Sequence, residues 1–282
     1  MKTILVPTEQ TTAMEAALSC ALLLAEKFGG RIEGFALRPA VAEMVAMDPD
    51  AGMTMVAVKE NDADMVRQAE EVFHTFMRRR NVLHYSKEAT PSPATVTWVW
   101  NADAPSGHDF VGSYGRVFDI IALARPGEEW QSPSMVTLES ALFESGRPVL
   151  IAPPEAPRSL ATNIMIAWNR STEQARATAF AMPLLKRAER VTILTVESAT
   201  VAGPSGEDLA RSLAAHGIVA ATITLASSKA NAGDTILKKA AELGCDLIVK
   251  GAYTQSRLRQ MIFGGTTRHI LTHAMVPVLM AH

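Results

Sequence analysis

The chain has 282 residues, of which 48% are hydrophobic and 20% charged, and its formal net charge is −2. The length suits two medium domains or one large domain, and the composition is that of a folded globular protein rather than a disordered one. A net charge this close to zero gives no reason to expect a nucleic acid or a membrane surface as a partner.

The first half of the sequence alternates between apolar strand-like runs and helical patterns. A buried strand at 3–8 leads into an alanine- and leucine-rich helix at 13–28, which Gly29 and Gly30 end, and then into a strand at 31–37. A strand, a helix and a strand joined by short turns indicate a right-handed βαβ unit and therefore a parallel sheet. We further expect a helix at 63–80, a strand at 95–100, a short helix or turn at 108–114, a strand at 119–124, a helix at 134–145 and a strand at 148–152.

Residues 39–62 show no clear element. They contain four methionines and Pro49, and their helical period is weak. We interpret them as an insertion in the first domain, and both an ordered extra helix and a mobile flap agree with the pattern.

A proline-rich segment at 153–157 separates the two halves, because proline removes backbone donors and stiffens a chain. It predicts one domain at 1–153 and another at 159–282. In the second domain we expect strands at 164–168, 191–196, 222–226, 246–249 and 276–280, and helices at 172–187, 208–216, 233–243 and 268–273.

The two halves repeat one pattern. Asp-Leu-Ile-Val at 246–249 matches Asp-Ile-Ile-Ala at 119–122, and Pro-Val-Leu-Met at 277–280 matches Pro-Val-Leu-Ile at 148–151. Self-similarity on this scale predicts two copies of one α/β domain.

A glycine-flanked basic loop distinguishes the second copy. It opens at Gly251, after a strand, and closes at Gly264 and Gly265, directly before Thr266 and Thr267 and a helix. The first N–H groups of a helix lack intrahelical partners and its dipole favours negative charge, so this is a candidate anion site. Either threonine could cap the helix or bind a phosphate oxygen.

The plainer interpretation of this loop is a strand-to-helix crossover with solvated basic residues, among them Lys250, Arg257 and Arg259. The corresponding stretch of the first copy reads Arg-Pro-Gly-Glu-Glu at 125–129. Proline lacks an N–H and the glutamates repel phosphate, so the second copy is the expected site for any phosphorylated ligand.

These features together resemble a tandem protein of the universal stress protein family. The resemblance spans 1–282 and is strongest at 246–282. It implies a stress-response protein with two Rossmann-like (adenine nucleotide alpha hydrolase-like) α/β domains, each a five-stranded parallel sheet with helices on both faces. Many members of that family bind ATP, and others do not. In the family's topology the last strand of each domain, at 148–152 and 277–281, lies at a sheet edge, so the resemblance implies that these two strands pair and form an internal pseudo-dimer. Whether two chains then form a homodimer stays open.

The ATP-binding members carry a loop with glycine, two residues, glycine, nine residues, and glycine followed by serine or threonine. Gly251 and Gly264 match this pattern, whereas Thr254 and Gly265 depart from it. A family aspartate that contacts the nucleoside corresponds to Asn169 here and to Glu9 in the first half.

The resemblance implies an ATP site, with Mg²⁺ as an optional companion, at the carboxyl ends of the strands of the second domain. Trp168 is the weakest member, because a tryptophan at a strand end is more often core. Adenosine would lie against Ala167, Trp168, Asn169 and Val196, and the phosphates against Gly251, Tyr253, Thr254, Gly264, Gly265, Thr266 and Thr267.

No other constellation points to chemistry. His269 and His273 have metal-ligand spacing, but no further ligand lies nearby, so we expect no zinc site. No Walker loop, nucleophile elbow or activated serine is present, so we expect no catalysis. The alternative to ATP binding is an interaction scaffold or a protein for another small ligand.

The sequence also bears on location. Cys20 and Cys245 lie in apolar surroundings and belong to no metal-spaced group, so both are expected to be buried. No apolar run reaches membrane-spanning length, and Met1 leads directly into a strand. We therefore expect a cytoplasmic protein.

Overall fold

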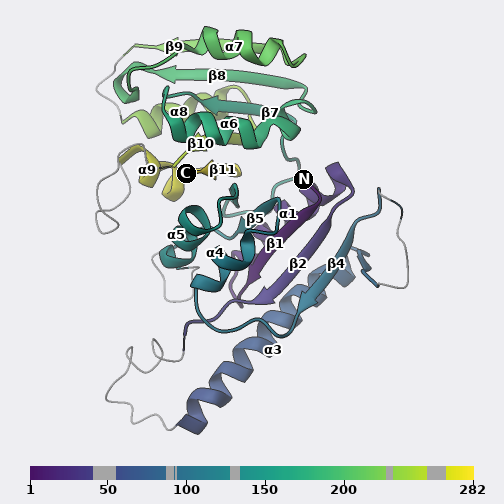
Figure 1. The fold of residues 1–282 in the computed structure, drawn as a ribbon. Helices are drawn as coiled ribbons and strands as arrows, with labels where there is room; N and C mark the ends of the chain where they lie inside the picture. Colours follow the sequence, from purple (N-terminus) through teal and green to yellow (C-terminus); the bar gives the residue numbers. More distant parts are fainter. Residues whose placement is uncertain (41–54, 87–91, 93, 128–133, 227–230, 253–264) are drawn as a thin grey trace. The chain divides into compact units, whose positions relative to one another are not determined.

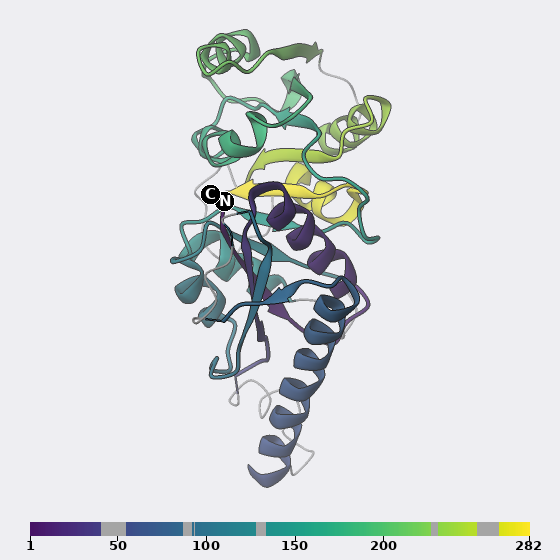
Figure 2. The ribbon, with the colours of Figure 1, turned by 90° about the vertical axis from the view of Figure 1, so that its right-hand side faces the viewer.

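The computed structural model describes residues 1–40, 55–86, 92, 94–127, 134–226, 231–252 and 265–282 (Figure 1). The chain divides into two compact units, Met1–Arg147 and Pro148–His282. Each unit is a parallel α/β sheet with helices on both faces, which confirms the predicted fold class (Figure 2).

The sheet of the first unit runs in the order β3-β4-β2-β1-β5, and all of these pairings are parallel. Helices α1 and α3 pack together on one face, and α4 and α5 pack together on the other (Figure 2). The strands are β1 (Thr3–Thr8), β2 (Arg31–Ala36), β3 (Leu83–His84), β4 (Thr97–Asn101) and β5 (Ile120–Leu123), and the helices are α1 (Met14–Phe28), α3 (Met55–Arg79), α4 (Asp109–Gly115) and α5 (Met135–Glu144).

Helix α1 shows why the sequence pattern predicts these elements well. Its apolar residues are buried against β1, β2 and β5. Gly29 then takes the left-handed conformation, with φ 63°, and its N–H donates to the carbonyl of Ala25. A residue with a Cβ is disfavoured there, so glycine ends the helix.

Helix α3 begins at Met55, eight residues before the predicted start at 63. The end of the predicted insertion 39–62 is therefore helical, and 41–54 lie outside the described residues. Methionine, alanine and lysine are good helix formers, so this stretch joins the helix although its apolar period is weak. Arg38 anchors it, because its Nε donates to Asp62 Oδ1 at 2.6 Å.

The sheet of the second unit runs in the order β6-β11-β10-β7-β8-β9. Five neighbouring strands, from β11 to β9, are parallel, as predicted. Helices α6 and α7 cover one face, and α8 and α9 cover the other (Figure 2). The strands are β6 (Val149–Ile151), β7 (Asn163–Ala167), β8 (Arg190–Val196), β9 (Ala220–Leu225), β10 (Leu247–Gly251) and β11 (Val278–Ala281), and the helices are α6 (Thr172–Leu185), α7 (Gly206–Ala214), α8 (Ala232–Glu242) and α9 (Gly265–His273), with a short 3₁₀ turn η1 (Glu197–Ala199).

The sixth strand, β6, confirms the predicted pairing of the two terminal strands. It lies antiparallel to β11, with Leu150 opposite Leu279. Because β6 pairs with β11, it belongs to the second unit, and the boundary between the units falls after Arg147. The predicted boundary, the proline-rich segment at 153–157, lies after β6. The wider pseudo-dimer inferred from the pairing stays a prediction.

Candidate functional site

The carboxyl ends of β7, β8 and β10 lie side by side in the second unit. Ala167 is in register with Leu194 of β8, two residues before Val196, and Val249 of β10 is in register with Ile166. The sheet thus brings together the ends of β7, β8 and β10, which contain residues predicted to contact a nucleotide. Ala167 and Val196 are buried, and Asn169 follows β7 in the adjoining turn.

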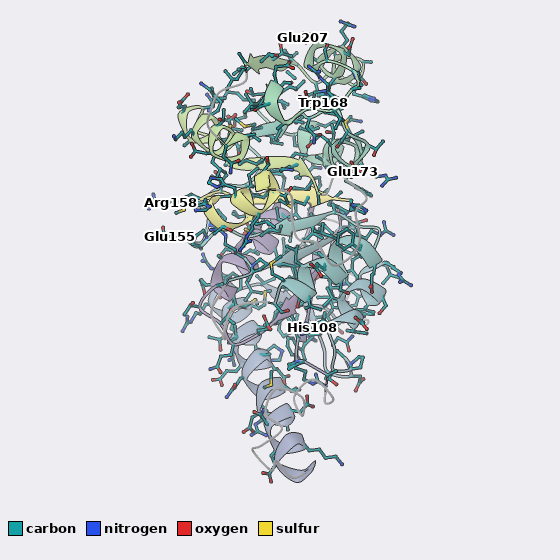
Figure 3. All side chains as sticks on the ribbon, turned by 90° about the vertical axis from the view of Figure 1, so that its left-hand side faces the viewer. His108, Glu155, Arg158, Trp168, Glu173 and Glu207 are labelled. Carbon is teal, nitrogen blue, oxygen red and sulfur yellow. The ribbon has the colours of Figure 1, made fainter. Side chains whose placement is uncertain are left out.

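Trp168 belongs to the core of this unit and offers little surface to a ligand. Its side chain is enclosed, with only 4% of the residue exposed (Figure 3). The indole Nε1 donates to the carbonyl of Pro204 at 2.9 Å, and the backbone N–H donates to Leu194 at 2.8 Å. The expectation that Trp168 contacts adenosine is therefore not supported by its geometry.

Asn169 organises the turn from β7 into α6. Its Oδ1 accepts the N–H of Ser171 at 3.2 Å, and Ser171 caps α6 by accepting the N–H of Gln174 at 3.2 Å. The backbone carbonyl of Asn169 accepts the N–H of Val201 at 3.1 Å. The side-chain oxygen expected to face a nucleoside is thus already used in a turn.

Gly251 is required by the packing of α6 against the end of β10. Its N–H donates to Gln174 Oε1 at 2.7 Å. A Cβ at this position would lie 2.4 Å from the backbone nitrogen of Gln174 and 2.6 Å from the carbonyl carbon of Glu173. Close packing alone therefore explains why the first residue of the predicted loop is glycine, and no ligand is needed to explain it.

Lys250 is the least expected residue of the site. It is only 6% exposed, and its ammonium group donates to the carbonyl of Gly251 at 2.8 Å and to Thr267 Oγ1 at 3.1 Å. No ion pair of Lys250 occurs in the described part of the chain. Burial lowers the pKa of Lys250 to about 8, because desolvation penalises the charged form. The sequence suggested a solvated charge, whereas the lysine ties β10 to the first turn of α9.

Helix α9 begins at Gly265, so Thr266 and Thr267 lie within its first turn and neither precedes it. The predicted N-cap role of these threonines is wrong for this reason. Thr267 is buried and its hydroxyl accepts a hydrogen bond from Lys250. Gly265 is exposed, and a Cβ there would meet no described residue within 4 Å. Tyr253, Thr254 and Gly264 lie outside the described residues, as do Arg257 and Arg259.

His269 and His273 stack on α9, with ring centroids 4.2 Å apart. His269 is half-buried beside Gly233 of α8, and His273 is exposed. His273 Nδ1 lies 3.0 Å from the carbonyl oxygen of His269. Among the described residues, no three histidine, cysteine, aspartate or glutamate side chains come together as a metal site would require.

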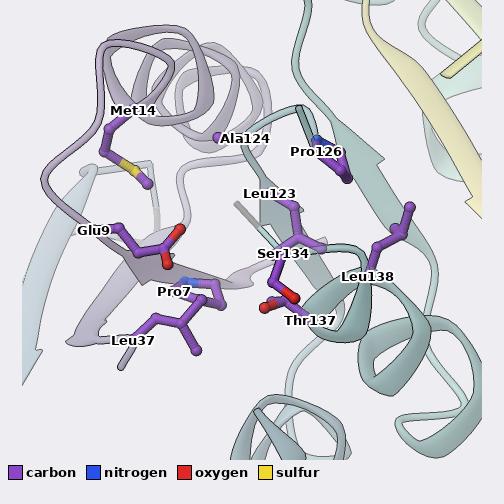
Figure 4. Close-up of a pocket in the computed structure, with 10 residues that line it drawn as sticks. All are labelled: Pro7, Glu9, Met14, Leu37, Leu123, Ala124, Pro126, Ser134, Thr137 and Leu138. Atoms are coloured by element: carbon purple, nitrogen blue, oxygen red, sulfur yellow. The ribbon is translucent and has the colours of Figure 1, made fainter. Parts of the chain in front are cut away.

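A pocket that the sequence did not predict lies in the first unit, at the carboxyl ends of β1, β2 and β5 and the start of α5 (Figure 4). Glu9 enters it from the turn after β1. Burial raises the pKa of Glu9 to about 7, since the carboxylate loses water there. The sequence signal was Glu9 itself, a carboxyl group at the position of the family aspartate.

Two hydroxyl groups complete the polar part of this pocket. Ser134 caps α5 by accepting the N–H of Val136 at 3.0 Å. Thr137 Oγ1 lies 2.8 Å from His108 Nδ1, which approaches from the start of α4. The other described residues that line the pocket are apolar.

The described helices are each too short or too polar to cross a membrane. Cys20 and Cys245 are free and buried, as expected.

Comparison with known proteins identifies the second half. The family model of the universal stress protein family matches residues 161–282. The fold is similar to that of a universal stress protein from Archaeoglobus fulgidus DSM 4304, with a TM-score of 0.70 and 18% identity over 99% of this chain and 97% of that one. A protein of unknown function from Pseudomonas aeruginosa PAO1 follows, with a TM-score of 0.53 and 15% identity over 100% of this chain and 92% of that one.

No curated protein sequence matches the chain. At these identities the two structures show a common fold and no more. The family model adds the identity of one half: residues 161–282 of this chain are a domain of the universal stress protein family.

Proposed function

We propose that this is a non-catalytic stress-response protein whose second unit binds an adenine nucleotide, ATP with or without Mg²⁺. The nucleotide would lie at the carboxyl ends of β7, β8 and β10, where ligands of open α/β sheets bind. Its phosphates would meet the first turn of α9 at Gly265 and Thr266.

The observation that carries this proposal is the environment of the start of α9. The N–H groups of a first helical turn favour an anion. Gly265 is exposed, and no described residue comes within 4 Å of where its Cβ would be. Behind that turn Lys250 holds a buried ammonium group against Thr267, at 3.1 Å. Helix dipole and lysine charge have the same sign, so both favour a phosphate.

Gly265 offers a matched pair of variants. Gly265→Asp places a carboxylate where phosphate is expected, while an acidic residue in a first turn suits the helix itself. Gly265→Ala adds only a methyl group, which would meet none of the described residues within 4 Å. Isothermal titration with ATP and Mg²⁺ should detect binding to the natural protein and to Gly265→Ala, and none to Gly265→Asp. Equal binding to all three proteins would refute the site.

The alternative is a protein without ATP, acting as an interaction scaffold or holding another small ligand. Two observations favour it: Asn169 Oδ1 is engaged with the N–H of Ser171, and Trp168 is enclosed in the core. Absence of ATP binding to the natural protein would decide for this alternative.

A further inference from the structure

A short segment leads from the end of β8 to the start of α7, and we name residues 197–205 the strap. It begins with η1, directly after Val196, and ends at Ser205, the N-cap of α7. The N–H of Ser205 donates to Asp208 Oδ2 at 2.8 Å, and the hydroxyl of Ser205 accepts the N–H of Asp208 at 3.2 Å. The strap is thus fixed at one end by a strand and at the other by a capping box.

Hydrogen bonds join the middle of the strap to the turn after β7. The N–H of Val201 donates to the carbonyl of Asn169 at 3.1 Å. The carbonyl of Pro204 accepts the indole N–H of Trp168 at 2.9 Å. Asn169 and Trp168 belong to the residues expected to contact adenosine, as does Val196 at the start of the strap. The strap therefore spans the nucleoside end of the proposed site, from the end of β8 to the end of β7.

Gly203 lets the strap lie directly on the backbone of Arg170. A Cβ at residue 203 would lie 2.8 Å from the carbonyl oxygen of Arg170 and 3.0 Å from its Cβ. Arg170 has φ 69°, in the left-handed region that residues other than glycine seldom adopt. Such a conformation persists where neighbouring contacts hold it, and it is found at clamps and switches. Release of the strap would remove one of these contacts and let Arg170 relax.

An ion pair also joins the strap to this turn. Arg170 Nη2 lies 2.9 Å from Oε1 of Glu197, the first residue of the strap. The side chains of Arg170 and Glu197 are 23% and 39% exposed, so water partly screens their attraction. Ion pairs of this kind shift an equilibrium by about two- to five-fold. That is enough to favour a closed strap and too little to lock it.

We propose that the strap is a gate over the nucleoside end of the site in the second unit, with the ion pair of Arg170 and Glu197 as its latch. A nucleotide binds when the contacts of Val201 and Pro204 with the turn after β7 have opened. The gate rests on the proposed nucleotide function. It also explains why the natural protein shows Asn169 and Trp168 engaged: they hold the closed strap.

A gate of this kind makes two quantities change together. When only the open form binds, the apparent dissociation constant is the intrinsic one divided by the open fraction. A variant with a weaker latch therefore opens more often and binds ATP more tightly, both by the same factor. Salt screens the latch, so the effect of the variant should disappear at high ionic strength.

Glu197→Gln removes the charge of the latch and keeps the side-chain shape. Glu242→Gln is the matched control, because it removes the same charge from an ion pair with Lys239 on α8, away from the strap. Hydrogen exchange of the Val201 N–H, measured by NMR on the full-length protein without ligand, reports opening of the strap. The amides of β8 serve as the reference for an intact fold.

At low salt the Val201 N–H should exchange about two- to five-fold faster in Glu197→Gln than in the natural protein and Glu242→Gln. In 1 M NaCl the three rates should be equal. The amides of β8 should exchange alike in all three proteins. Equal rates at Val201 at low salt would overturn the latch.

Isothermal titration at low salt with ATP and Mg²⁺ tests the gate itself. Glu197→Gln should bind ATP more tightly than the natural protein by the factor found for Val201 exchange, and Glu242→Gln should bind like the natural protein. Unchanged or weaker binding by Glu197→Gln would overturn the gate and leave the nucleotide site in place. No ATP binding by any of the three proteins would refute the proposed function, and the gate with it.

Discussion

The side-chain amide of Gln174 continues the edge of β10 where β7 has ended. Its Oε1 accepts the N–H of Gly251 at 2.7 Å, and its Nε2 donates to the carbonyl of Val249 at 3.3 Å. The backbone pairing of β7 with β10 stops at Val249, opposite Ile166. One buried amide therefore satisfies two backbone groups of β10 and fixes α6 over the end of the strand.

Gly251→Ala should destabilise the second unit. The new methyl group would lie 2.4 Å from the backbone nitrogen of Gln174, and α6 would have to move away. Overpacking of this kind costs about 1–3 kcal/mol. Urea denaturation measures the loss, with Gly265→Ala as the control, since that methyl group has no neighbour within 4 Å in the described part of the chain. Equal stability of the two variants would contradict the close packing.

Because Lys250 is buried, the free energy of unfolding should depend on pH in the alkaline range. Its folded-state pKa is lowered from 10.5 to about 8, so the unfolded chain binds more protons between these values. Stability should therefore rise with pH from about 8 to about 10.5, by up to about 3 kcal/mol. Lys250→Met should lack this rise. Urea denaturation of both proteins from pH 7.5 to 10.5 measures their free energies of unfolding. The same pH dependence in both proteins would show that burial does not disfavour the lysine charge.

Because of Glu9, the free energy of unfolding should show the opposite pH dependence near neutral pH. Its folded-state pKa is raised from 4.5 to about 7, so the folded chain binds more protons in that window and stability should fall as the pH rises through it. Glu9→Gln removes this loss and should exceed the natural protein in stability above pH 7, by up to about 3 kcal/mol. Thermal unfolding at pH 5 and pH 8 measures the difference. A variant that gains nothing at pH 8 would mean that Glu9 is well solvated.

The sequence predicted the framework because local patterns control it. Strand β1 occupies the expected residues 3–8, and Gly29 ends α1 as expected. The family resemblance, which puts the last strand of each domain at a sheet edge, also predicted the pairing of β6 with β11. The start of α3 at Met55 was missed, because its first turns have a weak apolar period.

The features of the sites were harder to predict, since they depend on tertiary packing. A lysine beside a loop is usually solvated. Lys250 is instead 6% exposed, because the folded chain places Thr267 of α9 against its ammonium group. Gln174 lies 77 residues from Gly251, so no local pattern links them. Glu9 was recognised only by position, and its apolar surroundings come from β2, β5 and α5.

The central claim is that one half of the chain binds a nucleotide and the other does not. Its most direct test is the stoichiometry of ATP binding by isothermal titration of the full-length protein with Mg²⁺. The account predicts one ATP per chain, held by the second unit. Two ATP per chain would mean that the first unit also binds the nucleotide, and no binding would mean that the start of α9 is not a nucleotide site.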